Sequence, residues 1–152
     1  MNKIKFLSAL VLGMFLSVFI LILNSCNSVD SNVTIKSADL AKELEGGKFE
    51  KVGTTFGTED GPLHLFVVVT NTLDSSSNSH DSIKVKASWY AIEAKDEKNV
   101  LINETVFVIG NEAETELNYK LYFPRPWLPG KYKVDLFLNG KLDRSIPFDV
   151  KE

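Results

Sequence analysis

Cysteine is almost absent from this 152-residue chain, because Cys26 is the only one, so no disulfide can form within one molecule. Histidine is also scarce, with two residues, His64 and His80, that lie well apart in the sequence. Zinc sites are built from Cys, His and acidic ligands, and this set is too poor to predict one. Few bases are available to activate a nucleophile. We therefore expect a protein without a catalytic residue, a metal or a cofactor.

Acidic residues are missing from the first 29 residues, where Lys3 and Lys5 precede an apolar run from Phe6 to Leu23. A basic start, an apolar stretch and small polar residues, in that order, form the layout of a secretory signal. The run is long for such a signal. At about 1.5 Å of rise per helical residue it could nearly cross a bilayer core. A transmembrane anchor is therefore the alternative interpretation.

The residues Leu23-Asn24-Ser25-Cys26 that end this run resemble the lipobox of bacterial lipoproteins. Asn24 departs from the smaller or aliphatic residue that is usual there. The resemblance covers the first 26 residues and implies cleavage before Cys26 and a diacylglycerol on its thiol. Two acyl chains meet the requirement for stable anchoring. We expect a signal peptide over 1–25 and a lipid anchor at Cys26 in the bacterial cell envelope, facing the periplasm or the exterior; the alternative is a free cysteine at the end of a membrane helix.

Basic residues are outnumbered by acidic ones in the rest of the chain. Removing Lys3 and Lys5 with the signal leaves 15 basic and 20 acidic residues in the remaining 127, a balance of −5. An acidic body argues against binding to nucleic acid and against docking on anionic lipid through charge. The expected partners are a membrane, through the lipid anchor, and an envelope protein or glycan.

Two short segments separate Cys26 from the main body of the chain. Residues 26–35 are polar and poor in large apolar groups, which predicts a flexible tether. Residues 36–47 contain a Ser that could cap a helix, good helix formers, Leu40 and Leu44 four residues apart, and a glycine that could end the helix. This pattern predicts a short amphipathic helix.

From Lys48 onward the apolar residues follow a period of two, which is typical of strands. In SIKVKASWYA (82–91) and GKYKVDLFLN (130–139), apolar residues alternate with mainly polar ones. The residues predicted to point inward are Ile83, Val85, Ala87, Trp89 and Ala91 in the first segment and Tyr132, Val134, Leu136 and Leu138 in the second. LFVVVT (65–70) is apolar on both faces, as expected of a central strand. Seven strands are predicted, over 48–57, 65–70, 82–91, 100–109, 115–123, 130–139 and 142–150. Such a set of short strands over about 100 residues predicts an all-β sandwich at 48–152.

The last two strands carry a turn signal, Asn139-Gly140, that favours a two-residue hairpin. A strict two-residue turn would place the apolar side chains of the two strands on opposite faces, which a half-buried sheet cannot tolerate. We therefore predict a three-residue loop or a bulge. One extra residue pairs Val134 with Ile146, Tyr132 with Phe148, Lys131 with Asp149 and Leu138 with Leu142. It also leaves Arg144 opposite Leu136, a mismatch that a neighbouring bulge would explain.

Residues 127–150, WLPGKYKVDLFLNGKLDRSIPFDV, resemble the last two strands of small immunoglobulin-like modules in bacterial surface proteins. In those modules an aromatic residue and a Pro-Gly turn precede a "GKYKV" strand, a hairpin and a closing "F-x-V". Trp89 is similar to the core tryptophan of such sandwiches. The resemblance implies an immunoglobulin-like β-sandwich. It does not imply one activity, because folds of this type host many functions.

The segment FPRPWLPG (123–130) is the candidate for contact with a partner. Its three prolines stiffen it, and Arg125 and Trp127 belong to residue types that are enriched in binding hot spots. The alternative is that Trp127 closes the end of the sandwich, as an aromatic residue before such a strand commonly does.

The leading interpretation is therefore a non-catalytic binding or assembly module, and two rivals stay open. One is an inhibitor or chaperone-like accessory that presents a strand edge or the 124–129 loop to a client. The other is a small carbohydrate-binding module, for which Tyr90, Tyr119 and Phe137 are the candidate aromatic residues. Asp81-Ser82-Ile83 also resembles a short O-glycosylation motif of some Bacteroidota, which leaves glycosylation of Ser82 open.

Overall fold

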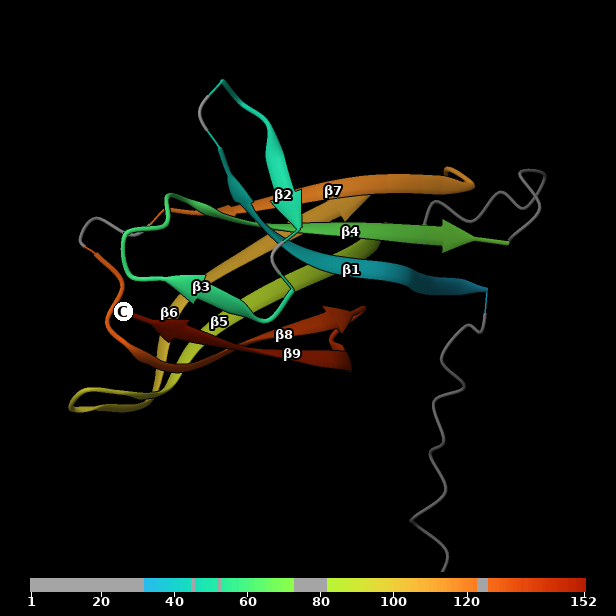
Figure 1. Ribbon diagram of the computed structural model, residues 1–152. Coiled ribbons are helices and arrows are strands. Elements are labelled where there is room, and N and C mark those ends of the chain that lie inside the picture. Colours follow the sequence, from blue (N-terminus) through green and yellow to red (C-terminus); the bar gives the residue numbers. More distant parts are fainter. Residues whose placement is uncertain (1–31, 45, 52, 73–81, 123–125) are drawn as a thin grey trace, which may run out of the picture. The chain divides into compact units, whose positions relative to one another are not determined.

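The computed structural model describes residues 32–44, 46–51, 53–72, 82–122 and 126–152, which form two β-sheets (Figure 1). Residues 6–26, with the apolar run and the lipobox, lie outside this part of the chain. The strands are β1 (Val33–Glu43), β2 (Phe49–Lys51), β3 (Thr55–Gly57), β4 (Leu63–Asn71), β5 (Ile83–Ala94), β6 (Glu97–Ile109), β7 (Glu114–Leu121), β8 (Gly130–Leu138) and β9 (Lys141–Lys151). Among the described residues no helix is long and apolar enough to span a membrane.

One sheet has the strand order β2-β1-β4-β7 and the other has the order β3-β9-β8-β5-β6. All neighbours are antiparallel except β3 and β9, which are parallel. The predicted all-β, two-sheet architecture is confirmed. The strands number nine in the described part of the chain instead of about seven.

The core lies between the two sheets and is made by alternate residues of the long strands. Every predicted inward residue of β5 and β8 is buried there: Ile83, Val85, Ala87, Trp89, Ala91, Tyr132, Val134, Leu136 and Leu138. The other sheet contributes the apolar residues of β4 and β7, among them Leu65, Val67 and Leu121. At about 25 cal/mol per Å² of buried apolar surface, this shared core is the main source of stability.

The helix predicted over 36–47 is wrong, because this segment belongs to the strand β1. A bulge in the β1–β4 ladder between Ile35 and Ser37 shifts the alternation by one residue, so that Leu40 then pairs with Leu65 and is buried. A two-turn helix has little stability of its own, and the long ladder with β4 outweighs its local propensity. The strand begins at Val33, so the predicted tether over 26–35 is wrong for its last residues.

The single strand predicted over 48–57 is two strands that belong to different sheets. β2 pairs with β1, whereas β3 pairs with β9, and Gly53, with φ of +70°, lies between them. A positive φ is readily adopted only by glycine, so the chain can change direction there. The division of 48–57 into β2 and β3, together with the unpredicted strand β1, accounts for the two additional strands.

The β8–β9 hairpin combines a tight turn with a bulge. Asn139 and Gly140 have φ of 49° and 82°, as a two-residue turn of type I′ requires. The register shifts between Leu136 and Phe137, so the predicted bulge is confirmed, as are the pairs Val134–Ile146, Tyr132–Phe148 and Lys131–Asp149. The predicted pair Leu138–Leu142 is wrong, because Leu138 pairs with Lys141.

Arg144, the predicted mismatch, lies opposite Leu136 as expected and connects the two sheets. Its Nη2 donates a 2.6 Å hydrogen bond to the carbonyl oxygen of Ile35, beside the bulge in β1. The guanidinium therefore satisfies a carbonyl at a place where the β1 ladder is irregular. A charged residue on an otherwise apolar strand face is tolerated because it reaches a backbone acceptor of the other sheet.

Candidate functional site

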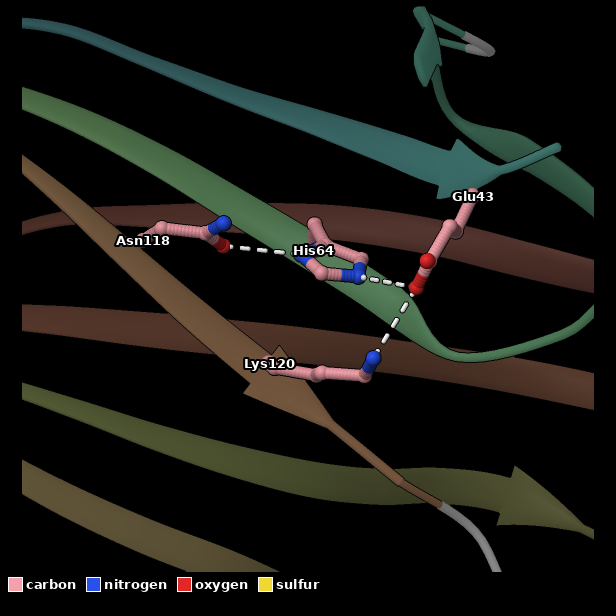
Figure 2. Close-up of polar contacts among 4 residues, drawn as sticks. All are labelled: Glu43, His64, Asn118 and Lys120. Carbon is pink, nitrogen blue, oxygen red and sulfur yellow. Dashed lines mark hydrogen bonds and ion pairs between the residues drawn. The ribbon is translucent and has the colours of Figure 1, made fainter. Parts of the chain in front are cut away.

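A cluster of polar side chains joins three strands of the four-stranded sheet (Figure 2). His64, the second residue of β4, is flanked by Glu43 at the end of β1 and by Asn118 and Lys120 on β7. The Nδ1 atom of His64 lies 2.8 Å from Oδ1 of Asn118, and its Nε2 lies 3.2 Å from Oε2 of Glu43. Lys120 Nζ donates to the same Glu43 oxygen at 2.9 Å. We call these four residues the histidine cluster.

Aromatic rings enclose the imidazole of the histidine cluster. Phe49 on β2 lies edge-on to His64 with a centroid separation of 4.8 Å, and Phe66 stacks at 6.0 Å. His64 is therefore buried, at 3% exposure, although it points to the outer side of its sheet. A buried imidazole needs partners for its ring nitrogens, and Asn118 and Glu43 supply them.

The donor and acceptor roles of the two ring nitrogens of His64 depend on its tautomer. The Glu43 carboxylate accepts hydrogen bonds, so the contact with Glu43 is satisfied when Nε2 carries the proton. In the neutral ring one nitrogen carries no proton, and the Asn118 amide must turn its Nδ2 toward Nδ1 to keep that contact. The cluster is a cross-strand clamp, because each ring nitrogen is held by a neighbouring strand and neither faces a hydroxyl nucleophile.

The hydrogen bond from Lys120, together with that from His64 and the charge of Lys120, lowers the pKa of Glu43 below its usual range. Folding therefore favours the carboxylate, and Glu43 contributes stability above its unfolded pKa of about 4.3. That contribution is lost as the pH falls through the lower folded value.

We expect the Glu43→Gln variant to lose less stability than the parent between about pH 5 and pH 3, because the amide cannot titrate. Urea midpoints at several pH values measure this difference. Glu152→Gln, at the exposed end of the chain, is the control and is expected to follow the parent. A parallel decline in Glu43→Gln and the parent would contradict the role of the clamp.

The predicted contact residue Trp127 is buried, at 3% exposure. Its ring packs edge-on to Tyr132 at 5.3 Å and to Phe148 at 6.1 Å, and its backbone N–H donates to the carbonyl of Thr58. The alternative interpretation is thus favoured, in which Trp127 closes the end of the sandwich. Arg125 lies outside the described residues, as does His80.

The three aromatic residues considered for carbohydrate binding do not share a surface. Tyr119 is in the core, where its hydroxyl donates to the carbonyl of Val85. Tyr90 and Phe137 do lie on the outer face of the five-stranded sheet, but an ammonium group covers each ring: Lys133 Nζ is 5.0 Å from the Tyr90 centroid and Lys86 Nζ is 4.5 Å from that of Phe137. Sugar stacking needs open ring faces, so this arrangement does not favour a glycan platform.

Two acidic residues, the exposed Glu104 and the buried Asp135, hold these lysines on the outer face. Glu104 accepts hydrogen bonds from Ser88 at 2.8 Å and from Lys86 at 3.1 Å, and these contacts lower its pKa. Asp135 accepts from Lys133 at 2.6 Å and from Ser145. In the described part of the chain, no group of three His, Cys, Asp or Glu residues could hold a metal ion.

The strand β6 forms one edge of the five-stranded sheet. It pairs with β5 along one side, and no described strand pairs with its other side. Val106 and Val108 are exposed, at 50% and 61%, on the outer face, while Phe107 packs inward on Tyr119 with a centroid separation of 4.6 Å. Its stretch from Asn103 to Ile109 contains one charged residue, no proline and no bulge. We call this stretch the β6 edge.

The other described edges carry the features that prevent edge-to-edge pairing. β7 has three charged residues, Glu114, Glu116 and Lys120. β2 and β3 have three residues each, and the parts of β1 and β9 beyond them are interrupted by bulges. β9 also contains Pro147, which has no N–H to donate. The β6 edge is the unprotected one.

Neither the histidine cluster nor the β6 edge was predicted from the sequence. Glu43 was placed in the wrongly predicted helix, and Asn118 lies 54 residues from His64, so no local motif joins them. The alternation of 100–109 predicted a strand, but alternation does not tell whether a strand is central or at an edge. That information is contained in the sheet order alone.

No family model matches the chain, and no curated protein sequence matches it. Among solved structures, the chain is similar to an alkylpurine DNA glycosylase from Pseudomonas fluorescens bound to DNA with an abasic site analogue, with a TM-score of 0.54 and 13% identity over 80% of this chain and 31% of the glycosylase. At this identity the likeness shows the fold alone.

Two further structures match less well. An immunoglobulin-like protein from Pseudomonas aeruginosa has a TM-score of 0.46 and 12% identity over 78% of this chain and 96% of that protein. A β-glucosidase from Listeria innocua in complex with glucose has a TM-score of 0.47 and 13% identity over 76% of this chain and 16% of the enzyme.

Proposed function

We propose that the chain is a non-catalytic binding or assembly module, tethered through a lipidated Cys26 to a membrane of a bacterial envelope, and that its sandwich is of the immunoglobulin-like type. The parallel pairing of β3 with β9 and the core position of Trp89 on β5 support this type. So does Tyr132 near the start of β8, whose hydroxyl donates a 2.7 Å hydrogen bond to the carbonyl of Leu128, four residues upstream. The lipobox residues support the anchor.

The module binds an extended segment of a partner protein by strand addition at the β6 edge. The observation that carries this proposal is an edge whose regular stretch has exposed valines and a single charge. Unpaired N–H and C=O groups along such an edge supply main-chain hydrogen bonds to an added strand. Val106 and Val108 supply apolar contacts to alternate side chains of that strand.

The anchor is tested on the full-length chain, expressed in bacteria, by the mass of the amino-terminal peptide from the membrane fraction. We expect this peptide to begin at Cys26 with acyl chains attached, because a lipobox directs cleavage before the cysteine. The Cys26→Ser variant is expected to keep residues 1–25. A parent chain that keeps residues 1–25 and a free thiol would replace the lipid anchor by a membrane helix.

Strand addition is tested with a photo-cross-linking amino acid at Val106 of the full-length chain in its native envelope. We expect one discrete adduct there and none when the probe replaces Leu142, which is similarly exposed on β9. Val108→Glu is expected to abolish the Val106 adduct, because it places an acidic charge at the edge, whereas Leu142→Glu leaves the adduct in place.

Both glutamate variants replace exposed side chains, so we expect their free energies of unfolding to stay within about 0.5 kcal/mol of the parent. An adduct that forms equally at Val106 and Leu142, or that survives Val108→Glu, would count against strand addition at the β6 edge.

A further inference from the structure

The regular part of the β6 edge has two ends, and these ends limit which residues an added strand can pair with. The β5–β6 ladder shifts next to Ile102, where Trp89 pairs with Asn103 and Tyr90 with Leu101. The strand ends at Ile109. The regular stretch between these limits is Asn103–Ile109, seven residues long, and its midpoint is Val106. A strand of this length is sufficient for a regular ladder.

This stretch is complementary to a second copy of itself. In an antiparallel pair with twofold symmetry centred on Val106, Val106 faces its own copy, Glu104 faces Val108, and Thr105 faces Phe107. Directly opposite residues then lie on the same face of the sheet, as pairing requires. The inner row joins an aromatic side chain to a β-branched one, which is a favourable cross-strand pair.

Charge selects the same centre. Lys84 on β5 pairs with Val108. With the twofold axis centred on Val106, Glu104 of the second copy lies opposite Val108, so its carboxylate stands in the same row of cross-strand neighbours as Lys84. Lys84 is exposed, and its ammonium contacts no acid among the described residues. A centre on Phe107 would place Val106 opposite Val108 and Glu104 opposite Gly110, so no carboxylate of the second copy's β6 edge would enter the row of Lys84.

We propose that the partner strand at the β6 edge is β6 of a second copy, paired antiparallel about Val106, so that two five-stranded sheets become one continuous sheet. This inference rests on strand addition at the β6 edge. A symmetric, isologous contact of this kind closes on itself and does not propagate into fibres. Attachment of both copies to one membrane would raise their effective concentration.

The test is a disulfide cross-link in the full-length chain in its membrane fraction. Opposite residues of an antiparallel pair have Cα atoms about 4.5–5.5 Å apart, within the range of about 4.4–6.8 Å that a disulfide spans. We expect the Val106→Cys variant to form a dimer under mild oxidation and to lose it under reduction. Glu104→Cys and Val108→Cys should each remain monomeric and cross-link when the two variants are expressed together.

Leu142→Cys is the control with similar exposure and is expected to stay monomeric, and the parent chain reports any cross-link through Cys26. Dimers that form equally at Val106 and Leu142, or in Glu104→Cys alone, would overturn the proposed pairing. If Val106→Cys stays monomeric while the photo-probe at Val106 captures a different protein, strand addition stands and the second copy is overturned. If neither forms an adduct, both proposals fail.

Discussion

Replacing Trp127 by alanine is expected to lower the free energy of unfolding by about 3–5 kcal/mol, the range for removing a buried large aromatic side chain. Trp127 fills the end of the sandwich against Tyr132 and Phe148, which stack on each other at 5.3 Å. The loss includes the contacts of the indole and the cavity left below it, because the two stacked rings are held by the β8–β9 ladder and cannot collapse into the space.

Urea unfolding followed by circular dichroism measures this loss. Tyr122→Ala is the matched control, because Tyr122 is 71% exposed, and its free energy of unfolding is expected to change by less than about 0.5 kcal/mol. A Trp127→Ala variant as stable as this control would mean that the indole does not support the core. In that case Trp127 would again be a candidate for contact with a partner.

Replacing Gly130 by alanine is expected to destabilise the fold by about 3 kcal/mol, at the upper end of the usual range for overpacking. A Cβ atom at Gly130 would lie 2.3 Å from the carbonyl oxygen of Glu93 and 2.7 Å from Cα of Ala94. Both obstacles are backbone atoms of β5. They cannot retreat without opening the ladder, in which Gly130 pairs with Ala94.

The same urea measurement tests this expectation, with Gly61→Ala as the control. A Cβ atom at Gly61 would meet only the carbonyl oxygen of Glu43, at an ordinary contact distance of 3.8 Å. We expect the control to be neutral or slightly stabilised, because alanine restricts the unfolded chain. Equal stability of the two variants would show that β5 and β8 can separate at Gly130 without a large loss.

Alternation predicted most of the fold because it is a local signal. The inward residues of β5 and β8 could be identified from the sequence, since each strand buries one complete face. The same logic found the bulge in β9, because Val134 and Ile146 had to share a face. β1 was missed for a related reason: its own bulge at Lys36 breaks the alternation, and the remaining spacing of Leu40 and Leu44 imitates a helix.

The surfaces proposed for binding could not be derived in this way. Whether Trp127 faces the core or a partner depends on the end of the sandwich, which three segments distant in sequence build together. The β6 edge is defined by the absence of a neighbouring strand, and only the sheet order reveals it. The histidine cluster requires β1, β4 and β7 to lie side by side, which depends on the ladder that the predicted helix excluded.

The hydrogen bond from Arg144 to the Ile35 carbonyl joins residues 109 positions apart. It can therefore form only after β9 has been synthesised. The ribosome releases β1 first and β9 last. β9 also holds β3, which has no other strand partner in the described part of the chain. A nascent chain that ends before Lys141 therefore lacks one side of its second sheet, so the sandwich cannot close until β9 has been synthesised. Contacts between such distant segments form slowly, and the growing chain must be protected from aggregation until then.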